Sequence, residues 1–173
     1  MTPVLPLLLA LGLSGCAGAS TDRLAAEAEP QAAVEAAAPA TLAQDLRPLA
    51  AQALELAELV QAAATDPAVV GLAQRITTEQ QGLLDDVDAL LAGTAALPGE
   101  TASLAADELA AVRSAAGDEA VRLGLDGLLR THLDAVARAK AEVADGRTGA
   151  QGELSRRVLD EQGATLQELS ALG

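Results

Sequence analysis

The sequence predicts an all-α protein. Alanine (42 residues) and leucine (31 residues) dominate the 173-residue chain, and both favour helices. The chain has no Phe, Tyr or Trp and is poor in β-branched residues, which are the residues that sheets prefer. Apolar residues recur at spacings of three and four, as in helices that pack against other helices. The length suits one domain with extensions.

The composition excludes several classes of function. Acidic residues outnumber basic ones, 25 to 11, which gives a formal net charge of −14, and no aromatic ring is available to stack on bases. We therefore expect no nucleic-acid binding. One Cys and one His exclude an intramolecular disulfide and a multi-histidine metal site within one chain. No motif pairs a nucleophile with a base, so we expect neither an enzyme nor a bound cofactor.

Residues 1–15 are predicted to be a lipoprotein signal peptide. The apolar run from Val4 to Leu13 is about half as long as a membrane span. It leads into Leu13-Ser14-Gly15-Cys16, which resembles the bacterial lipobox, where the Cys thiol receives a diacylglycerol. Cys16 is therefore the predicted lipidation site, with a buried or unmodified thiol as the alternative. Ala17 in place of Asp points, by the lipoprotein sorting pattern, to the outer membrane of a two-membrane cell.

Residues 16–40 are predicted to be a disordered tether between the lipid and the folded part. They are mostly Ala, Glu, Ser and Thr, and Pro30 and Pro39 interrupt any helix. The sequence thus predicts an extracytoplasmic protein, anchored by acyl chains to the bacterial cell membrane or outer membrane.

The first half of the folded part, 41–173, is predicted to contain two long helices. Thr41 is the expected N-cap of the first, which runs to about Ala64 and is kinked or shortened at Pro48. Thr65-Asp66-Pro67 ends it and starts the second, which ends before Gly93. The next residues, 93–101, are expected to form a loop.

Three more helices are predicted in the second half. Ser103 is the expected cap of a short helix over 104–116. Gly117-Asp118 separates it from a long helix that runs to about Asp145, and a last helix starts at about Ala150. Each long helix has an expected inward face. These faces comprise Leu42, Leu46, Leu49, Ala53, Leu56 and Val60; Val69, Leu72, Ile76, Leu83, Leu84, Val87 and Leu90; Leu125, Leu129, His132, Val136, Ala139 and Val143; and Leu154, Val158, Leu166, Leu169 and Leu172.

The two halves resemble each other at an offset of 82 residues. Residues 46–91 lie over 128–173 without a gap, and 12 of the 46 positions are identical. The informative matches are Arg75/Arg157, Glu79/Glu161 and Gln80/Gln162. Repeats at about 41–93 and 117–173 therefore predict two equal hairpins that pack into a four-helix bundle, with the short helix as the crossover. The alternative is a coincidence between helices of low complexity.

The repeats resemble a bacterial family catalogued as domain of unknown function 305. Residues 45–57 (DLRPLAAQALELA) are similar to the first helix of its repeat, and 64–81 are similar to the second. Residues 128–146 and 154–169 follow the same plan. The resemblance covers about 41–173 and implies a ferritin-like bundle, secreted or lipid-anchored, that binds copper in some members.

The metal-binding residues that the resemblance implies are missing. The family's Met, its two His and its later Met correspond to Leu46, Leu49, Ala50 and Leu56 in the first repeat, and to Leu128, Thr131, His132 and Arg138 in the second. Hydrocarbon side chains offer copper no lone pair, and a single imidazole does not make a site. We therefore expect no metal at these positions.

Three polar residues on the inner faces have alternative interpretations. His132 is expected to be a partly buried histidine that hydrogen-bonds to a Gln or a hydroxyl across the bundle, with a metal-binding or catalytic role as the alternative. Gln80 and Gln162 either hydrogen-bond across the bundle and fix its register or lie at the edge of the seam.

The sequence therefore favours a non-enzymatic, lipid-anchored envelope protein that has lost its copper site and acts as a binding or structural module. The expected partners are the membrane, through the lipid, and an unidentified envelope protein or a second copy of the chain. The alternative is an extracytoplasmic copper-handling protein with a residual site or one shared between subunits through His132 and carboxylates.

Overall fold

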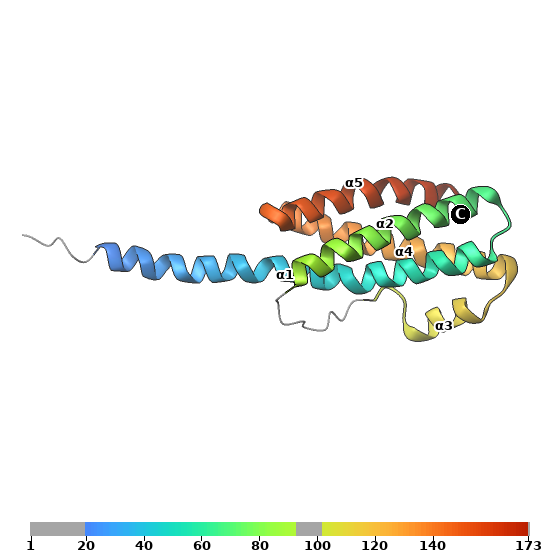
Figure 1. Ribbon diagram of the computed structural model, residues 1–173, viewed down its shortest axis with the longest axis horizontal. Helices are drawn as coiled ribbons and strands as arrows, with labels where there is room; N and C mark the ends of the chain where they lie inside the picture. The colour runs from blue at the N-terminus through green and yellow to red at the C-terminus, as the bar shows by residue number, and fades with distance from the viewer. Residues whose placement is uncertain (1–19, 93–101, 173) are drawn as a thin grey trace, which may run out of the picture. The chain divides into compact units, whose positions relative to one another are not determined.

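The computed structural model describes residues 20–92 and 102–172, with side chains from residue 42 onward. Its five helices are α1 (Ser20–Ala63), α2 (Pro67–Leu91), α3 (Ala106–Ser114), α4 (Gly117–Ala144) and α5 (Gly149–Leu172) (Figure 1). The chain divides into two compact units, Met1–Glu35 and Ala36–Gly173. The second unit is an all-α bundle, as the sequence predicts. Within the described ranges, no helix has both the length and the apolar character that crossing a membrane requires.

The start of the first helix differs from the prediction. α1 begins at Ser20, so Thr41 is not its N-cap, and the segment predicted as a disordered tether is helical from Ser20 to residue 40. Alanine is the strongest helix former, and this segment is rich in it. α1 also continues through Pro48. The predicted signal peptide and Cys16 lie outside the described residues.

The predicted breaks between the long helices are confirmed. Asp66 caps α2 by accepting a hydrogen bond from the Ala68 backbone N–H at 2.8 Å, and Pro67 occupies the first turn. Gly117 has a φ of 57°, a left-handed conformation that suits glycine, where α3 gives way to α4.

The predicted cap of the short helix is wrong. The Ser103 hydroxyl donates to the Asp134 carboxylate on α4 at 2.5 Å, and α3 begins later, after Ala105. The Glu108 carboxylate accepts the Ala105 N–H at 2.9 Å, so an acidic side chain in the first turn replaces the expected hydroxyl cap.

The contacts between the hairpins have the two-fold symmetry that the 82-residue offset predicts. Arg75 on α2 forms an ion pair with Glu168 on α5, and Arg157 on α5 forms one with Asp86 on α2. Adding 82 to 75 gives 157, and adding 82 to 86 gives 168. The two ion pairs are therefore equivalent, and α2 and α5 are antiparallel. This reciprocity supports a duplicated hairpin over a coincidence of similar helices.

α1 and α4 approach closely at two glycines of α4. A Cβ added to Gly124 would lie 2.4 Å from Cγ2 of Val60, and one added to Gly127 would lie 3.0 Å from Cδ1 of Leu56. A Cβ contact of 2.4 Å essentially never occurs in proteins and one of 3.0 Å is unusually tight, so the glycines allow the α1 side chains to reach the α4 backbone. The offset makes Asp45 and Arg138 the counterparts of Gly127 and Leu56, and these two residues form an ion pair at 2.9 Å.

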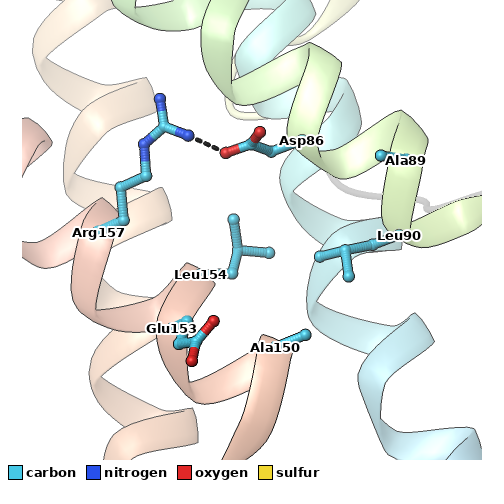
Figure 2. A pocket seen from close by; sticks show the side chains of 7 residues that line it. All are labelled: Asp86, Ala89, Leu90, Ala150, Glu153, Leu154 and Arg157. Carbon is cyan, nitrogen blue, oxygen red and sulfur yellow. Dashed lines mark hydrogen bonds and ion pairs between the residues drawn. The ribbon is translucent and has the colours of Figure 1, made fainter.

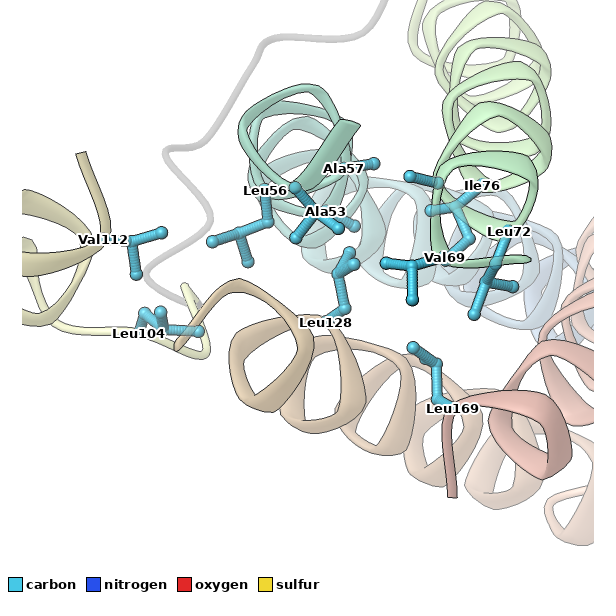
Figure 3. Close-up of a cluster of buried hydrophobic side chains, with 12 residues drawn as sticks. Ala53, Leu56, Ala57, Val69, Leu72, Ile76, Leu104, Val112, Leu128 and Leu169 are labelled. Atoms are coloured by element: carbon cyan, nitrogen blue, oxygen red, sulfur yellow. The ribbon is translucent and has the colours of Figure 1, made fainter. Parts of the chain in front are cut away.

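Two clusters of buried apolar side chains form the core. The first cluster comprises Ala53, Leu56, Ala57, Val60, Val69, Leu72, Ala73, Ile76, Leu104, Val112, Leu128 and Leu169 (Figure 3). The second cluster comprises Leu42, Ala43, Leu46, Leu49, Ala50, Leu83, Val87, Ala135, Ala139, Leu154 and Val158. Side chains from α1, α2, α4 and α5 meet in both clusters, which is the arrangement expected of a four-helix bundle.

Several predicted core residues lie at the edge of these faces. Leu84 and Leu166 are half-buried, because the buried stripe of each helix passes through the preceding residue, Leu83 or Thr165. Leu90, Leu125 and Leu129 are also half-buried. Val143 and Leu172 are exposed because they stand in the last turns of α4 and α5, beyond the last buried residues, Ala139 and Leu169.

The close approach of α1 and α4 predicts opposite effects for two glycine substitutions. Gly124→Ala should destabilise the fold, because the new methyl group would overlap the stiff Val60 side chain. Gly163→Ala, at an α5 position with no atom within 4 Å of the new methyl group, should stabilise it by about 0.5–1 kcal/mol. Urea denaturation followed by circular dichroism measures both, and equal effects of the two substitutions would contradict this packing.

Candidate functional site

A layer of buried polar side chains separates the two apolar clusters. On α2, Gln80 lies between Ile76 of the first cluster and Leu83 of the second. On α4 and α5 the corresponding places hold buried polar residues as well. The layer consists of Gln80, Thr131, His132, Gln162 and Thr165. We call it the central polar layer, and it contains two of the positions that the family resemblance marks as metal-binding, Thr131 and His132.

His132 and Gln80 form the main contact within the central polar layer. Each side chain is only 1% exposed. The His132 Nδ1 lies 2.8 Å from the Leu128 carbonyl oxygen, which can only accept, so Nδ1 carries the proton. The Gln80 amide nitrogen lies 3.3 Å from Nε2 and donates to its lone pair. Both ring nitrogens are therefore satisfied when the imidazole is neutral.

Burial also favours the neutral form of His132. Desolvation lowers the pKa of this imidazole below its ordinary value of 6.5, and the hydrogen bond to the Leu128 carbonyl opposes the shift only in part. The neighbours named above carry no formal charge. A proton on this ring would therefore lack a counter-ion and would confront the Gln80 amide N–H.

The remaining positions implied by the resemblance are packed with hydrocarbon or already bonded. Leu49, Ala50 and Leu56 are buried in the two apolar clusters. The Thr131 hydroxyl donates to the Gly127 carbonyl of its own helix at 2.8 Å. Arg138 is half-buried and pairs with Asp45 on α1, so its cation links two helices.

These residues do not fit a copper ion. The one imidazole in the layer uses its free lone pair to accept from Gln80, and the residue equivalent to His132 in the first repeat is Ala50. Across the described ranges, no three His, Cys, Asp or Glu side chains gather closely enough to hold a metal ion. At the positions where the resemblance implies copper donors, the side chains form other hydrogen bonds and ion pairs or pack as hydrocarbon.

The two ends of the bundle differ in polarity, which the sequence pattern did not predict. The first cluster contains Leu56, Val60 and Val69. Their counterparts at the other end are Arg138, Glu142 and Gln151, by the offset of 82. Within the described part of the chain, the Nε of Arg138 and both amide atoms of Gln151 are buried without a hydrogen-bond partner, whereas Oε2 of Glu142 forms an ion pair with Nε of Arg147 at 3.3 Å. The second cluster is therefore bordered by incompletely paired polar groups.

A second polar row joins α2 to α5 at the surface. The Thr165 hydroxyl donates to the Glu79 carboxylate at 2.9 Å, beside the ion pair between Arg75 and Glu168. Burial raises the pKa of Glu79, the Thr165 hydrogen bond lowers it, and the repeat-equivalent carboxylate of Glu161 raises it further. The Glu79 and Glu161 carboxylates are therefore close enough to repel each other. They occupy equivalent positions in the two repeats, so they lie near the axis that relates the repeats.

Comparisons with known proteins agree with this architecture. The model of the family described as "Domain of unknown function (DUF305)" matches residues 40–172. A crystal structure of a DUF305 fragment from Deinococcus radiodurans superimposes with a TM-score of 0.68 and 22% sequence identity, and the match covers 78% of this chain and 93% of that one. No curated protein matches the chain. At this identity, the structural likeness establishes the fold alone.

The buried imidazole predicts a pH dependence of stability. Because folding lowers the pKa of His132, the unfolded chain binds a proton that the folded chain lacks as the pH falls below about 6.5. Stability should therefore be highest above that pH and should decline by up to about 1.4 kcal/mol per pH unit below it. The measurement is urea denaturation between pH 5 and 8, compared with His132→Gln, which keeps an amide but does not titrate. Parallel curves for the two proteins would rule out a buried, neutral His132.

Proposed function

Since the chain belongs to the DUF305 family, we propose that it is a non-enzymatic, lipid-anchored protein of the bacterial envelope that has lost the family's copper site. In this proposal it acts by binding another protein or as a structural module. The observation that carries it is the chemistry of the positions implied as metal-binding. Gln80 donates to the free lone pair of His132, hydrocarbon fills positions 49, 50 and 56, and Thr131 and Arg138 already have polar partners.

A copper-handling function is less well supported. A site shared between two subunits would require His132 to reach the surface of the bundle, and its side chain is 1% exposed. The Nε2 lone pair would also have to leave Gln80. Both changes would cost packing and hydrogen bonding in the middle of the bundle.

The anchor is supported by the sequence. Cys16 is the only thiol, and it lies three residues after the end of an apolar run that is too short to cross a bilayer. Several acyl chains on one thiol would provide the multiple membrane signals that stable anchoring needs. The high negative charge of the chain disfavours any further contact with acidic lipid headgroups.

The anchor can be tested by a single substitution. Cys16→Ser should abolish labelling by a palmitate analogue and move the protein from the membrane fraction to the soluble fraction in a bacterial host, because no other thiol can accept the acyl chains. Equal membrane partitioning of the variant and the wild type would contradict the proposed lipidation.

The loss of the copper site can be tested by writing the family's donors back. In a Cys16→Ser background, which removes the competing thiol, the chain should bind copper no more tightly than about 100 μM by isothermal titration. A variant with Leu49→His, Ala50→His, Leu56→Met, Thr131→His and Arg138→Met should bind it much more tightly. Positions 49 and 56 are two helical turns apart and lie on one face of α1.

The stability of the rewritten variant provides the control. Without copper it should melt at a lower temperature than the wild type, since Leu49 and Leu56 are core residues, and copper should restore the loss. Tight copper binding by the Cys16→Ser chain without the five donor substitutions would contradict the lost-site proposal. A folded variant that binds no copper would show that the donor positions are assigned wrongly.

A further inference from the structure

A groove of about 550 Å³ lies between the C-terminal part of α2 and the N-terminal part of α5. Ala89 and Leu90 of α2 line it from one side, and Ala150 and Leu154 of α5 line it from the other (Figure 2). Asp86, Glu153 and Arg157 stand around this apolar surface, and a dashed line in Figure 2 marks the ion pair between Asp86 and Arg157. The volume lies within the range of ligand and side-chain pockets.

The groove carries an excess of negative charge. Arg157 is shared between Asp86 and Glu161, which lies 3.0 Å from its Nε, so one cation serves two carboxylates. Among the described residues, no ion-pair partner is seen for Glu153. The lining itself has two carboxylates, Asp86 and Glu153, against one guanidinium, a charge of −1, and Glu161 beside Arg157 adds a further negative charge. The neighbouring Arg156 is not among the residues that line the groove.

The repeat provides a comparison for this charge. By the offset of 82, the counterpart of Glu153 is Gly71, whereas Asp86 and Arg157 have the ion-paired counterparts Glu168 and Arg75. The Glu153 carboxylate, which has no ion pair among the described residues, is therefore specific to the groove between the C-terminal part of α2 and the N-terminal part of α5. It is not a consequence of the duplication.

We propose that this groove binds a basic amphipathic helix of a partner protein. The apolar side chains of such a helix would pack on Leu90 and Leu154, and its Lys or Arg side chains would pair with Glu153 and Asp86. A groove between two antiparallel helices accepts the side chains of a third helix, and this mode of recognition combines a few apolar anchors with complementary charge. The proposal rests on the binding role proposed above and specifies the chemistry of the partner.

The charge of the chain argues against other occupants. A second copy would bring another −14 to an already acidic surface, and nucleic acid or an acidic peptide would be repelled for the same reason. Sedimentation of the full chain alone should therefore show no self-association that depends on this groove.

The test uses the full chain and a fluorescent 18-residue helical peptide of leucine and lysine, whose binding is followed by anisotropy. Ala89→Arg should weaken binding by about tenfold or more, because it places a long cation in the groove. Ala171→Arg is the matched control, since residue 171 is the exposed counterpart of Ala89, and it should change the affinity by less than about twofold. Glu153→Gln should weaken binding more than Glu58→Gln, an exposed position on α1.

Several outcomes would overturn the proposal. The first is that the peptide does not bind. The second is that Ala89→Arg and Ala171→Arg have equal effects, which would indicate attraction to the acidic surface as a whole. The third is that a peptide with glutamate in place of lysine binds equally tightly. Capture from detergent-solubilised envelope separates this result from the broader binding role. A protein retained equally by wild type and Ala89→Arg would leave that role intact and place the binding surface elsewhere.

Discussion

The close packing of α1 against α4 is the constraint on which the other features of the bundle depend. With no aromatic side chain available, the core is filled by Leu, Val, Ile and Ala, and the helices must pack closely to leave no empty space. Gly124 and Gly127 permit this approach by receiving Val60 and Leu56. The same packing holds the interior positions of α1 and α4 in a dry environment, where a lone polar group must find a partner. His132 meets that requirement through Leu128 and Gln80.

The duplication explains both the symmetry of the bundle and its departures from symmetry. The equivalent ion pairs of Arg75 and Arg157 hold α2 to α5 at two places. Elsewhere the equivalent positions have diverged: Leu56 packs on a glycine, whereas its counterpart Arg138 pairs with Asp45. Exposed ion pairs contribute little to stability, so the symmetric pairs mainly set the register of two helices whose apolar contacts do the stabilising. Divergence at the remaining sites gives one end of the bundle a polar interior and an acidic groove.

Much of the fold could be predicted from the sequence, because helix spacing, the Asp66-Pro67 start and the offset of 82 are local or internal patterns. The exact faces were harder to predict: Leu83 and Leu84 are both leucine, and only packing decides which of them is buried. The loss of copper donors remains a prediction of the family resemblance. The partner of His132 could be expected only as a Gln or a hydroxyl. The charge partners of Arg138 and Arg157 and the groove beside Glu153 could not be predicted, since they depend on how helices far apart in the sequence face each other.

In this bundle His132 is a structural residue whose free lone pair accepts a hydrogen bond from Gln80. The most direct measurement is nitrogen NMR of the single imidazole in the labelled protein at neutral pH, before and after copper is added. The structure predicts a neutral ring with its proton on Nδ1, an Nε2 signal that changes in a Gln80→Leu variant, and no change on addition of copper in a Cys16→Ser background. A proton on Nε2, or loss of the imidazole signals when copper is added, would contradict this account.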